Sequence, residues 1–273
     1  MNRFVLQVFA LFFCLSLFGQ EYAIEKDIPY RDSKTEKLDP YTQERSVLDI
    51  YYPKDAKGYA TIFWIHGGGL QSGNKYFPEE LLNQGMAVVA INYRLYPKAK
   101  APACIDDAAA ALAWVFSNIE KYGGDPEKIF VTGHSAGGYL VSMIGLDKKY
   151  LKKHGVDADK VRAYLPLSGQ AITHSTIRGD KGFSRTQPII DQYAPVHHVR
   201  ADAPPFILIT GGRDKDIPAR YEENVYMKRL MEQVGHKETL LHELDGFDHG
   251  AMVGPGCQLV LSHIRELFKE GKE

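Results

Sequence analysis

Short apolar runs alternate with amphipathic stretches from residue 46 to the end of the chain. The run 47–52 alternates apolar and polar side chains, which is typical of an early antiparallel strand. The later runs are mostly apolar, as in strands that are covered on both faces. They span residues 60–65, 87–92, 129–132, 163–167, 206–210 and 239–244. The pattern therefore predicts a sheet whose central strands are buried.

Helical periodicity separates these runs. The clearest helix opens at Pro102 and continues to about Tyr122, where two glycines end it. Further helices are expected at 222–233 and 258–268. Strands that alternate with helices form a mostly parallel sheet with helices on both faces, which makes this an α/β chain. Residues 171–200 have no clean period and are expected to form a long excursion over the carboxyl edge of the sheet.

The first residues differ from the rest. A basic start at 1–3 precedes an almost wholly apolar run at 4–18. This is the pattern of a secretory signal peptide, and the run is too short to span a membrane. We therefore expect a signal peptide at 1–19, a single domain at 20–273, a secreted or periplasmic protein, and no stable membrane span after cleavage. The charged segment Glu21–Lys37 is interpreted as a solvated leader.

Composition narrows the function classes. The chain has 33 basic and 34 acidic residues, so it carries no overall charge that would attract nucleic acid, and nucleic-acid binding is not expected. Removal of the signal peptide leaves Cys104 and Cys257. They either form one disulfide or behave as two small buried apolar residues, and the sequence does not decide between these alternatives.

The sequence GHSAGG at 133–138 lies between an apolar run and a helical stretch. A serine on a tight strand-to-helix turn needs very small neighbours, and its hydroxyl is then held out at the end of the sheet. The alternative is a serine that merely caps the following helix. The strand before the motif and the helix after it favour a nucleophile elbow, with Ser135 as the nucleophile.

A second glycine-rich stretch, HGGG at 66–69, follows the apolar run 60–65. Glycines there leave backbone amides free to hold a developing oxyanion. Together with the amide of Ala136, which follows the serine, Gly67 or Gly68 is predicted to form an oxyanion hole.

A serine hydroxyl needs a base to take its proton and a carboxylate to hold that base. In this arrangement the acid and then the histidine follow the serine, each after a later strand. Asp214 lies just past the run 206–210, and His249 follows the run 239–244. The predicted triad is Ser135, Asp214 and His249, with Asp216 as the alternative acid.

Other histidines are given structural roles. His66 is expected to brace the glycine loop, His134 to point away from the serine, and His242 to be packed in a strand. His174, His197 and His198 fall in the excursion and are expected at the surface.

These motifs resemble the α/β-hydrolase family, and within it the bacterial carboxylesterases related to hormone-sensitive lipase and to the feruloyl esterases of Bacteroidetes. The matching pieces are LDIYYP, WIHGGG, INYRL, YGGDPEKIFVTGHSAGGYL, GGRDKDIP and DHG, in that order over residues 47–250. The resemblance implies an α/β-hydrolase fold with about eight strands and a two-step serine esterase that needs no metal or organic cofactor. It also implies a structural ion pair between Arg94 and Asp107.

Two departures refine this expectation. Relatives of hormone-sensitive lipase usually have an acidic residue before the serine, whereas His134 stands here, which favours the feruloyl-esterase-like branch. Little sequence is left for an N-terminal cap, so a small or absent cap and an open site are expected. The predicted substrates are short-chain or aromatic acyl esters, including small-molecule and oligosaccharide esters. The alternatives are an amide hydrolase, such as a formamidase or peptidase relative, and an inactive binding module.

Overall fold

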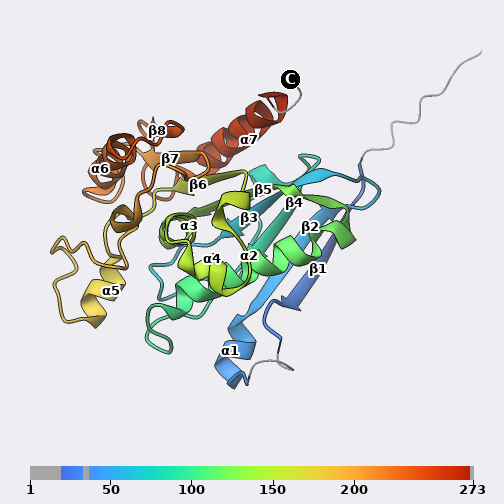
Figure 1. Ribbon diagram of the computed structural model, residues 1–273, viewed down its shortest axis with the longest axis horizontal. Helices are drawn as coiled ribbons and strands as arrows, with labels where there is room; N and C mark the ends of the chain where they lie inside the picture. Colours follow the sequence, from blue (N-terminus) through green and yellow to red (C-terminus); the bar gives the residue numbers. More distant parts are fainter. Residues whose placement is uncertain (1–19, 33–36, 271–273) are drawn as a thin grey trace, which may run out of the picture.

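The computed structural model describes residues 20–32 and 37–270, and its centre is an eight-stranded sheet with the order β1-β2-β4-β3-β5-β6-β7-β8. Strands β3 to β8 are parallel, whereas β2 pairs antiparallel with both β1 and β4. The sheet runs through the molecule from β1 at one edge to β8 at the other (Figure 1). The strands are β1 (Tyr22–Pro29), β2 (Val47–Pro53), β3 (Tyr59–Ile65), β4 (Ala87–Ile91), β5 (Gly124–His134), β6 (Ala163–Leu167), β7 (Phe206–Gly211) and β8 (Thr239–Leu244).

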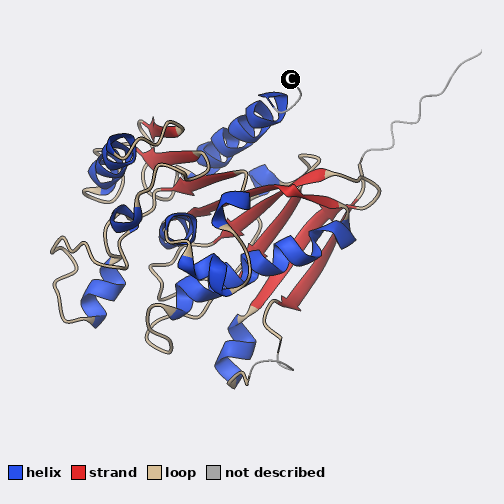
Figure 2. Cartoon of the chain, viewed as in Figure 1, coloured by secondary structure: helices blue, strands red, loops and turns tan. Residues whose placement is uncertain are grey.

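Helices cover both faces of the sheet, and the layers are visible in Figure 2. The helices are α1 (Pro40–Arg45), α2 (Ala103–Tyr122), α3 (Ala136–Leu146), α4 (Lys149–Lys153), α5 (Ser175–Asp180), α6 (Arg220–Gln233) and α7 (Val253–Glu270). Three short 3₁₀ helices lie at Glu79–Leu81, Ala158–Lys160 and Pro195–His198. This is the α/β-hydrolase architecture that the sequence predicts.

The sheet divides the core into two layers because successive strand residues face opposite sides. Phe63 and Ile65 of β3 pack with α2 and α3, whereas Ile62 and Trp64 pack with α7 on the other face. Cys104 belongs to the first layer and Cys257 to the second. Both cysteines are buried and free, so the disulfide alternative is excluded and the apolar one holds.

Each predicted strand and helix is present, with shifted ends at β5 and α7, and the main disagreement lies at the N-terminal edge. The interpretation of Glu21–Lys37 as a solvated leader is wrong, because Tyr22–Pro29 forms β1. This strand pairs with one neighbour and most of its residues are exposed, so it lacks the apolar pattern that reveals the buried strands. The predicted signal peptide at 1–19 lies outside the described residues.

Helix boundaries follow local capping signals. Helix α2 ends at Gly123, whose φ of 98° lies in the left-handed region that favours glycine. Helix α7 begins at Val253, five residues before the predicted start at 258, and its first four residues include two glycines and a proline. The excursion at 171–200 contains only the short α5 and one 3₁₀ turn.

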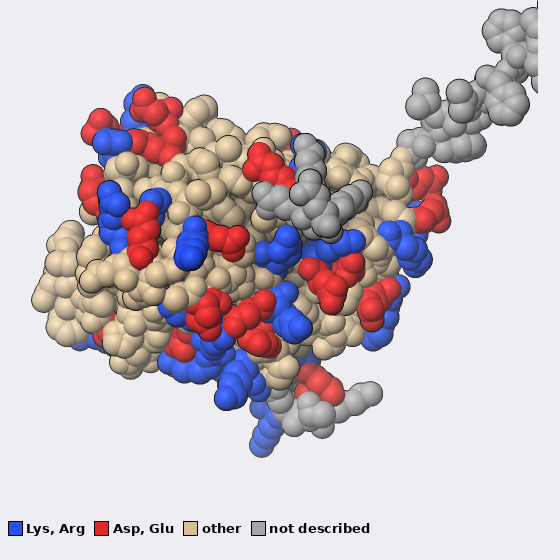
Figure 3. Space-filling model, turned by 45° about the horizontal axis from the view of Figure 1, so that its top comes forward, with Lys and Arg blue, Asp and Glu red and all other residues tan. Residues whose placement is uncertain are grey.

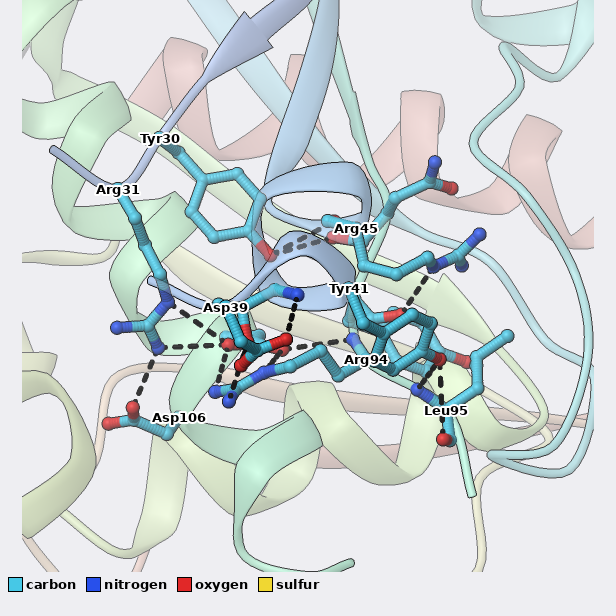
Figure 4. A network of polar contacts seen from close by, with 12 residues as sticks. Tyr30, Arg31, Asp39, Tyr41, Arg45, Arg94, Leu95 and Asp106 are labelled. Carbon is cyan, nitrogen blue, oxygen red and sulfur yellow. Dashed lines mark hydrogen bonds and ion pairs between the residues drawn. The ribbon is translucent and has the colours of Figure 1, made fainter. Parts of the chain in front are cut away.

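A buried ion network connects the segment just after β1 to helix α2 (Figure 4). The fully buried carboxylate of Asp107 accepts hydrogen bonds from the guanidinium groups of Arg31, at 2.8 Å, and Arg94, at 2.7 Å. The neighbouring Asp106 accepts from Arg31 at 2.7 Å and from Lys153 at 2.8 Å. The expected pair of Arg94 and Asp107 is therefore present, and Arg31 extends it to the N-terminal strand.

Charged side chains of both signs are mixed over the face shown in Figure 3. This agrees with the near balance of 33 basic and 34 acidic residues in the sequence. Within the described residues, no helix combines the length and the apolar character needed to cross a bilayer.

The network predicts a large effect of the change Asp107→Asn on stability. Removing this carboxylate charge takes the acidic partner from the largely buried guanidinium of Arg94 and removes one of the carboxylates that Arg31 contacts, which costs about 3–5 kcal/mol of unfolding free energy. Urea unfolding measures the loss. The change Glu21→Gln is the control, because Glu21 pairs with Lys54 through side chains that are 71% and 51% exposed, and it should leave the midpoint unchanged. An equal effect of both changes would contradict a structural role for the network.

Candidate active site

Ser135 stands on a sharp turn between β5 and α3. Its φ of 57° and ψ of −116° are strained for a residue with a side chain. The glycines around it make the turn possible: a methyl group on Gly137 would lie 2.0 Å from the carbonyl oxygen of Ile65, and one on Gly138 would lie 2.7 Å from that of Leu167. Larger residues at these positions would push α3 away from the sheet, so the small residues of the motif have a steric cause.

His249 lies between Ser135 and a carboxylate. Its Nε2 is 2.8 Å from Ser135 Oγ, and its Nδ1 is 2.6 Å from Asp216 Oδ1. With the proton on Nδ1, the ring donates to the carboxylate and accepts from the serine hydroxyl, so both contacts are satisfied at once. The structure thus brings Ser135 and His249 together, as the sequence predicts.

The prediction that Asp214 is the acid is wrong, because the carboxylate that contacts His249 belongs to Asp216. After β7 the chain forms a tight turn in which the amides of Lys215 and Asp216 donate to the carbonyl of Gly212. This turn directs Asp214 into solvent and returns Asp216, whose side chain is 1% exposed, to the end of the strand. Distance from the strand in sequence suggested Asp214, but the turn reverses the order in space.

Hydrogen bonds hold the Asp216 carboxylate in its ionised form. Burial by itself would raise the pKa of Asp216, but hydrogen bonds from His249 and Ser168 outweigh burial and hold this pKa well below its usual range. The backbone amides of Gly211 and Ile217 also donate to the carboxylate, at 2.9 and 2.7 Å. A charged acceptor therefore faces the imidazole at neutral pH.

A backbone hydrogen bond joins the loop after β7 to the loop after β8. The amide of Gly212, in the loop after β7, donates to the carbonyl of Phe247, in the loop after β8, at 2.9 Å. The first loop carries Asp216 and the second carries His249.

The predicted oxyanion residues lie beside the serine. A methyl group on Gly67 would come within 3.2 Å of Ser135 Cβ, which places this glycine directly against the elbow. Gly68 follows with a φ of 102°, and Ala136 opens helix α3. Within the described residues, no hydrogen bond occupies the amides of Gly68 and Ala136, so both remain available to a ligand.

Aromatic stacking braces the glycine loop. The ring of His66 stacks on Tyr93 with centroids 4.4 Å apart, and the Tyr93 hydroxyl donates to the carbonyls of His66 and Gly67 at 3.1 and 3.2 Å. Arg45 donates to the Gly73 carbonyl at 3.0 Å, which fixes the far end of the loop. His66 therefore has the bracing position expected from the sequence.

His134 is closer to the site than the sequence indicated. Its Nε2 donates to the backbone carbonyl of His249 at 2.8 Å, and the two rings lie 4.6 Å apart. Burial, assisted by the nearby His249, lowers the pKa of His134 to about 4, so this ring is neutral near pH 7. Its side chain holds the backbone of the histidine that contacts the serine hydroxyl.

Histidines outside the active site make structural contacts. His174 was expected at the surface, but it is 3% exposed and caps α5 by accepting from the amide of Thr176. His242 packs against His263, with their Nε2 atoms 2.9 Å apart. Within the described part of the chain, no group of three or more histidine, cysteine or acidic residues is arranged to hold a metal ion.

Sequence reasoning missed Ser168. This serine directly follows β6, and its hydroxyl lies 2.7 Å from Asp216 Oδ2 and 3.0 Å from His249 Nδ1. The sequence feature that could have indicated Ser168 is its position directly after β6, because β6 lies between β5, which leads to Ser135, and β7, which leads to Asp216.

Comparison with known proteins relates the chain to esterases. The sequence pattern of the BD-FAE family matches residues 48–228. The probable carboxylic ester hydrolase LipM of Mycobacterium tuberculosis is 32% identical over 227 residues, which cover 74% of this chain and 50% of LipM. Esterase LipC of the same organism is 29% identical, over 94% of this chain and 68% of LipC. The chain thus spans about half to two thirds of the length of these relatives.

A solved structure shares the fold. A truncated carbohydrate esterase from gut microbiota superimposes with a TM-score of 0.74 at 23% sequence identity, covering 92% of this chain and 98% of that one.

The buried histidines predict a loss of stability in mild acid. Burial lowers the pKa values of His66, His134 and His174 to about 4, 4 and 3, against an ordinary value of 6.5. The unfolded chain therefore binds more protons between about pH 6.5 and 4, so the stability present above this window is lost as the pH falls through it.

Each such histidine contributes about 1.4 kcal/mol of unfolding free energy per pH unit inside the window. Urea unfolding at pH 6 and pH 4.5 measures the slope. The change His174→Asn preserves an acceptor for the Thr176 amide but does not titrate, and it should reduce the slope by about that amount. An unchanged slope would show that His174 protonates equally in the folded and unfolded states.

Proposed function

Because the chain belongs to the BD-FAE family of α/β-hydrolase esterases, we propose that it hydrolyses carboxylic esters with Ser135 as nucleophile. The observation that carries the proposal is the hydrogen-bonded series from Ser135 through His249 to Asp216. A serine, a histidine with Nδ1 on a buried carboxylate, and free amides beside the serine are the parts that acyl transfer needs.

The first step forms an acyl-enzyme. The Ser135 oxygen attacks the ester carbonyl carbon while His249 Nε2 takes the hydroxyl proton, and Asp216 stabilises the imidazolium through Nδ1–H. The carbonyl oxygen becomes negative and accepts hydrogen bonds from the amides of Ala136 and of Gly67 or Gly68. The carbon–oxygen bond to the alcohol then breaks, and the alcohol leaves with the proton from His249.

The second step reverses these roles. Water gives a proton to His249 Nε2 and its oxygen bonds to the acyl carbon. The bond to Ser135 then breaks, Ser135 recovers the proton, and the carboxylic acid leaves. Every proton passes through one nitrogen, so the mechanism depends on the orientation of a single ring.

The substrates are short-chain or aromatic acyl esters, including acylated carbohydrates. The stretch between β6 and β7 supports this class, because its described residues form α5, a short 3₁₀ helix and loops rather than a helical cap. The fold neighbour named as a carbohydrate esterase is consistent with it. The proposal also includes export of the protein, which rests on the basic start and apolar run at 1–19 of the sequence.

The two aspartates give opposite predictions for activity. Asp216→Asn should lower kcat by about 10⁴-fold, because the amide cannot hold His249 in the reactive tautomer. Asp214→Asn should leave kcat nearly unchanged, since Asp214 is exposed and makes no contact with His249. Hydrolysis of p-nitrophenyl acetate measures both variants, and Ser135→Ala sets the background rate. A larger loss in Asp214→Asn would return the role of the acid to that residue.

Covalent labelling separates the esterase from its alternatives. A fluorescent phosphonate should label the wild-type protein at Ser135 and leave Ser135→Ala unlabelled, whereas a folded protein that stays unlabelled would be a binding module.

An ester panel then tests the substrate class. Acetyl, butyryl, feruloyl and acetylated-sugar esters should be cleaved faster than a palmitoyl ester, and p-nitrophenyl acetate faster than the matching arylamide. Amines are poorer leaving groups than alkoxides and need better-placed acid catalysis, so preference for the arylamide would indicate an amide hydrolase.

A further inference from the structure

Ser168 occupies a strained and fully buried position at the carboxyl end of β6. It has a φ of 46°, in the left-handed region that favours glycine, and 0% of its surface is exposed. A glycine would adopt this backbone without strain. The hydroxyl therefore stands in a place where the backbone alone would favour a residue without a side chain.

The hydroxyl completes the set of donors around Asp216. Oδ1 accepts from His249 Nδ1 at 2.6 Å and from the Ile217 amide at 2.7 Å. Oδ2 accepts from Ser168 Oγ at 2.7 Å and from the Gly211 amide at 2.9 Å. Each carboxylate oxygen thus has two donors, and these four bonds fix the plane of the group.

Ser168 also contacts the imidazole directly. Its oxygen lies 3.0 Å from His249 Nδ1. A hydroxyl has one proton to donate and two lone pairs to accept. Because the proton is directed to Asp216, the lone pairs face the Nδ1–H of His249. The imidazole proton is therefore shared between the carboxylate and the hydroxyl.

The backbone of Ser168 is held on both sides. Its amide donates to the Ile209 carbonyl at 2.7 Å. Its carbonyl accepts from the buried guanidinium of Arg220, and Asn224 donates to the next carbonyl, that of Gly169, at 2.9 Å. Helix α6 thus clamps the residue in its strained conformation, and the hydroxyl has a fixed direction.

We propose that Ser168 is a positioning residue that acts through Asp216 and His249, orienting the carboxylate and keeping the imidazole aimed at Ser135. This inference rests on the proposed esterase function. Ser168 itself is not expected to touch the substrate. Its contribution is greatest when His249 carries two protons, because Nδ1–H is then the stronger donor and two acceptors receive it.

The primary variants are Ser168→Ala and Ser168→Gly, and the matched control is Ser142→Ala. Ser142 is also a buried serine, 3% exposed, but its hydroxyl donates only to the Gly138 carbonyl of its own helix. On a soluble ester, both Ser168 variants should lose about 10- to 100-fold in kcat with KM unchanged, well short of the loss in Asp216→Asn. Ser142→Ala should retain wild-type kcat.

The glycine variant separates the hydroxyl from the backbone. It removes the side chain and relieves the positive φ, so it should fold at least as readily as the alanine variant. Equal losses in both variants support the proposal. Wild-type activity in Ser168→Gly would overturn it, because that variant has no hydroxyl at this position.

A double-mutant cycle tests whether Ser168 acts through Asp216. Adding Ser168→Ala to Asp216→Asn should lower kcat no further, because the group that Ser168 orients has already lost its charge. A full additional loss of 10-fold or more would show an independent effect and contradict the proposal.

A spectroscopic measurement gives an answer independent of turnover. The hydrogen-bonded Nδ1 proton of His249 should give a low-field proton NMR resonance that moves in Ser168→Ala and stays in place in Ser142→Ala. An unmoved resonance in Ser168→Ala would exclude the shared proton. If the wild-type protein neither cleaves esters nor reacts with the phosphonate, the proposed function fails, while the resonance still decides the contact.

Discussion

Lack of space at one point of the sheet edge is the constraint on which the site depends. Gly137 and Gly138 bring the start of α3 against the carbonyls of Ile65 and Leu167, so closely that neither position has room for a methyl group. This approach forces the strand-to-helix turn and lifts Ser135 away from the backbone. It also brings the glycine loop after β3 against the serine, because Ile65 is the last residue of that strand. One steric requirement therefore positions both the hydroxyl and the amides beside it.

The order of the strands supplies the other groups. Strands β5, β6, β7 and β8 are consecutive neighbours, and their carboxyl ends lead to Ser135, Ser168, Asp216 and His249 in that order. Parallel strands end at a common edge, so residues that are far apart in the chain meet without a long loop having to fold back. Hydrogen bonds within the protein then fix how each group faces its neighbour.

Most of this fold can be predicted from the sequence because buried strands have an apolar composition. Strands covered on both faces must be apolar throughout, and all of them were recognised from that property. Strand β1 was not recognised in the sequence, because it is mostly exposed and pairs with one neighbour. Its charged residues therefore resemble those of a solvated segment. The ion network at Asp107 anchors this edge, yet the part played by Arg31 is not encoded in any local pattern.

The sequence predicts which strand ends carry the site residues, but not which side chain after each strand points into the site. Sequence placed an acid after β7, but the tight turn at Gly212 decides that Asp216 faces His249 and Asp214 faces water. In the same way, the position of Ser168 after β6 indicates the strand end that it occupies but not that its hydroxyl faces Asp216. Which way a side chain points after a strand depends on hydrogen bonds with other loops, and these exist only once the chain has folded.

The bond between Gly212 and Phe247 has a mechanical consequence. The loops that carry the carboxylate and the imidazole are coupled, so any displacement shifts both together. The distance within that unit then changes little, and motion is taken up instead between the imidazole and the elbow, where the hydrogen bond from His134 to the carbonyl of His249 must yield. A bulky acyl group that presses on this edge would thus alter the alignment of the serine with the ring while leaving the ring and the carboxylate in register.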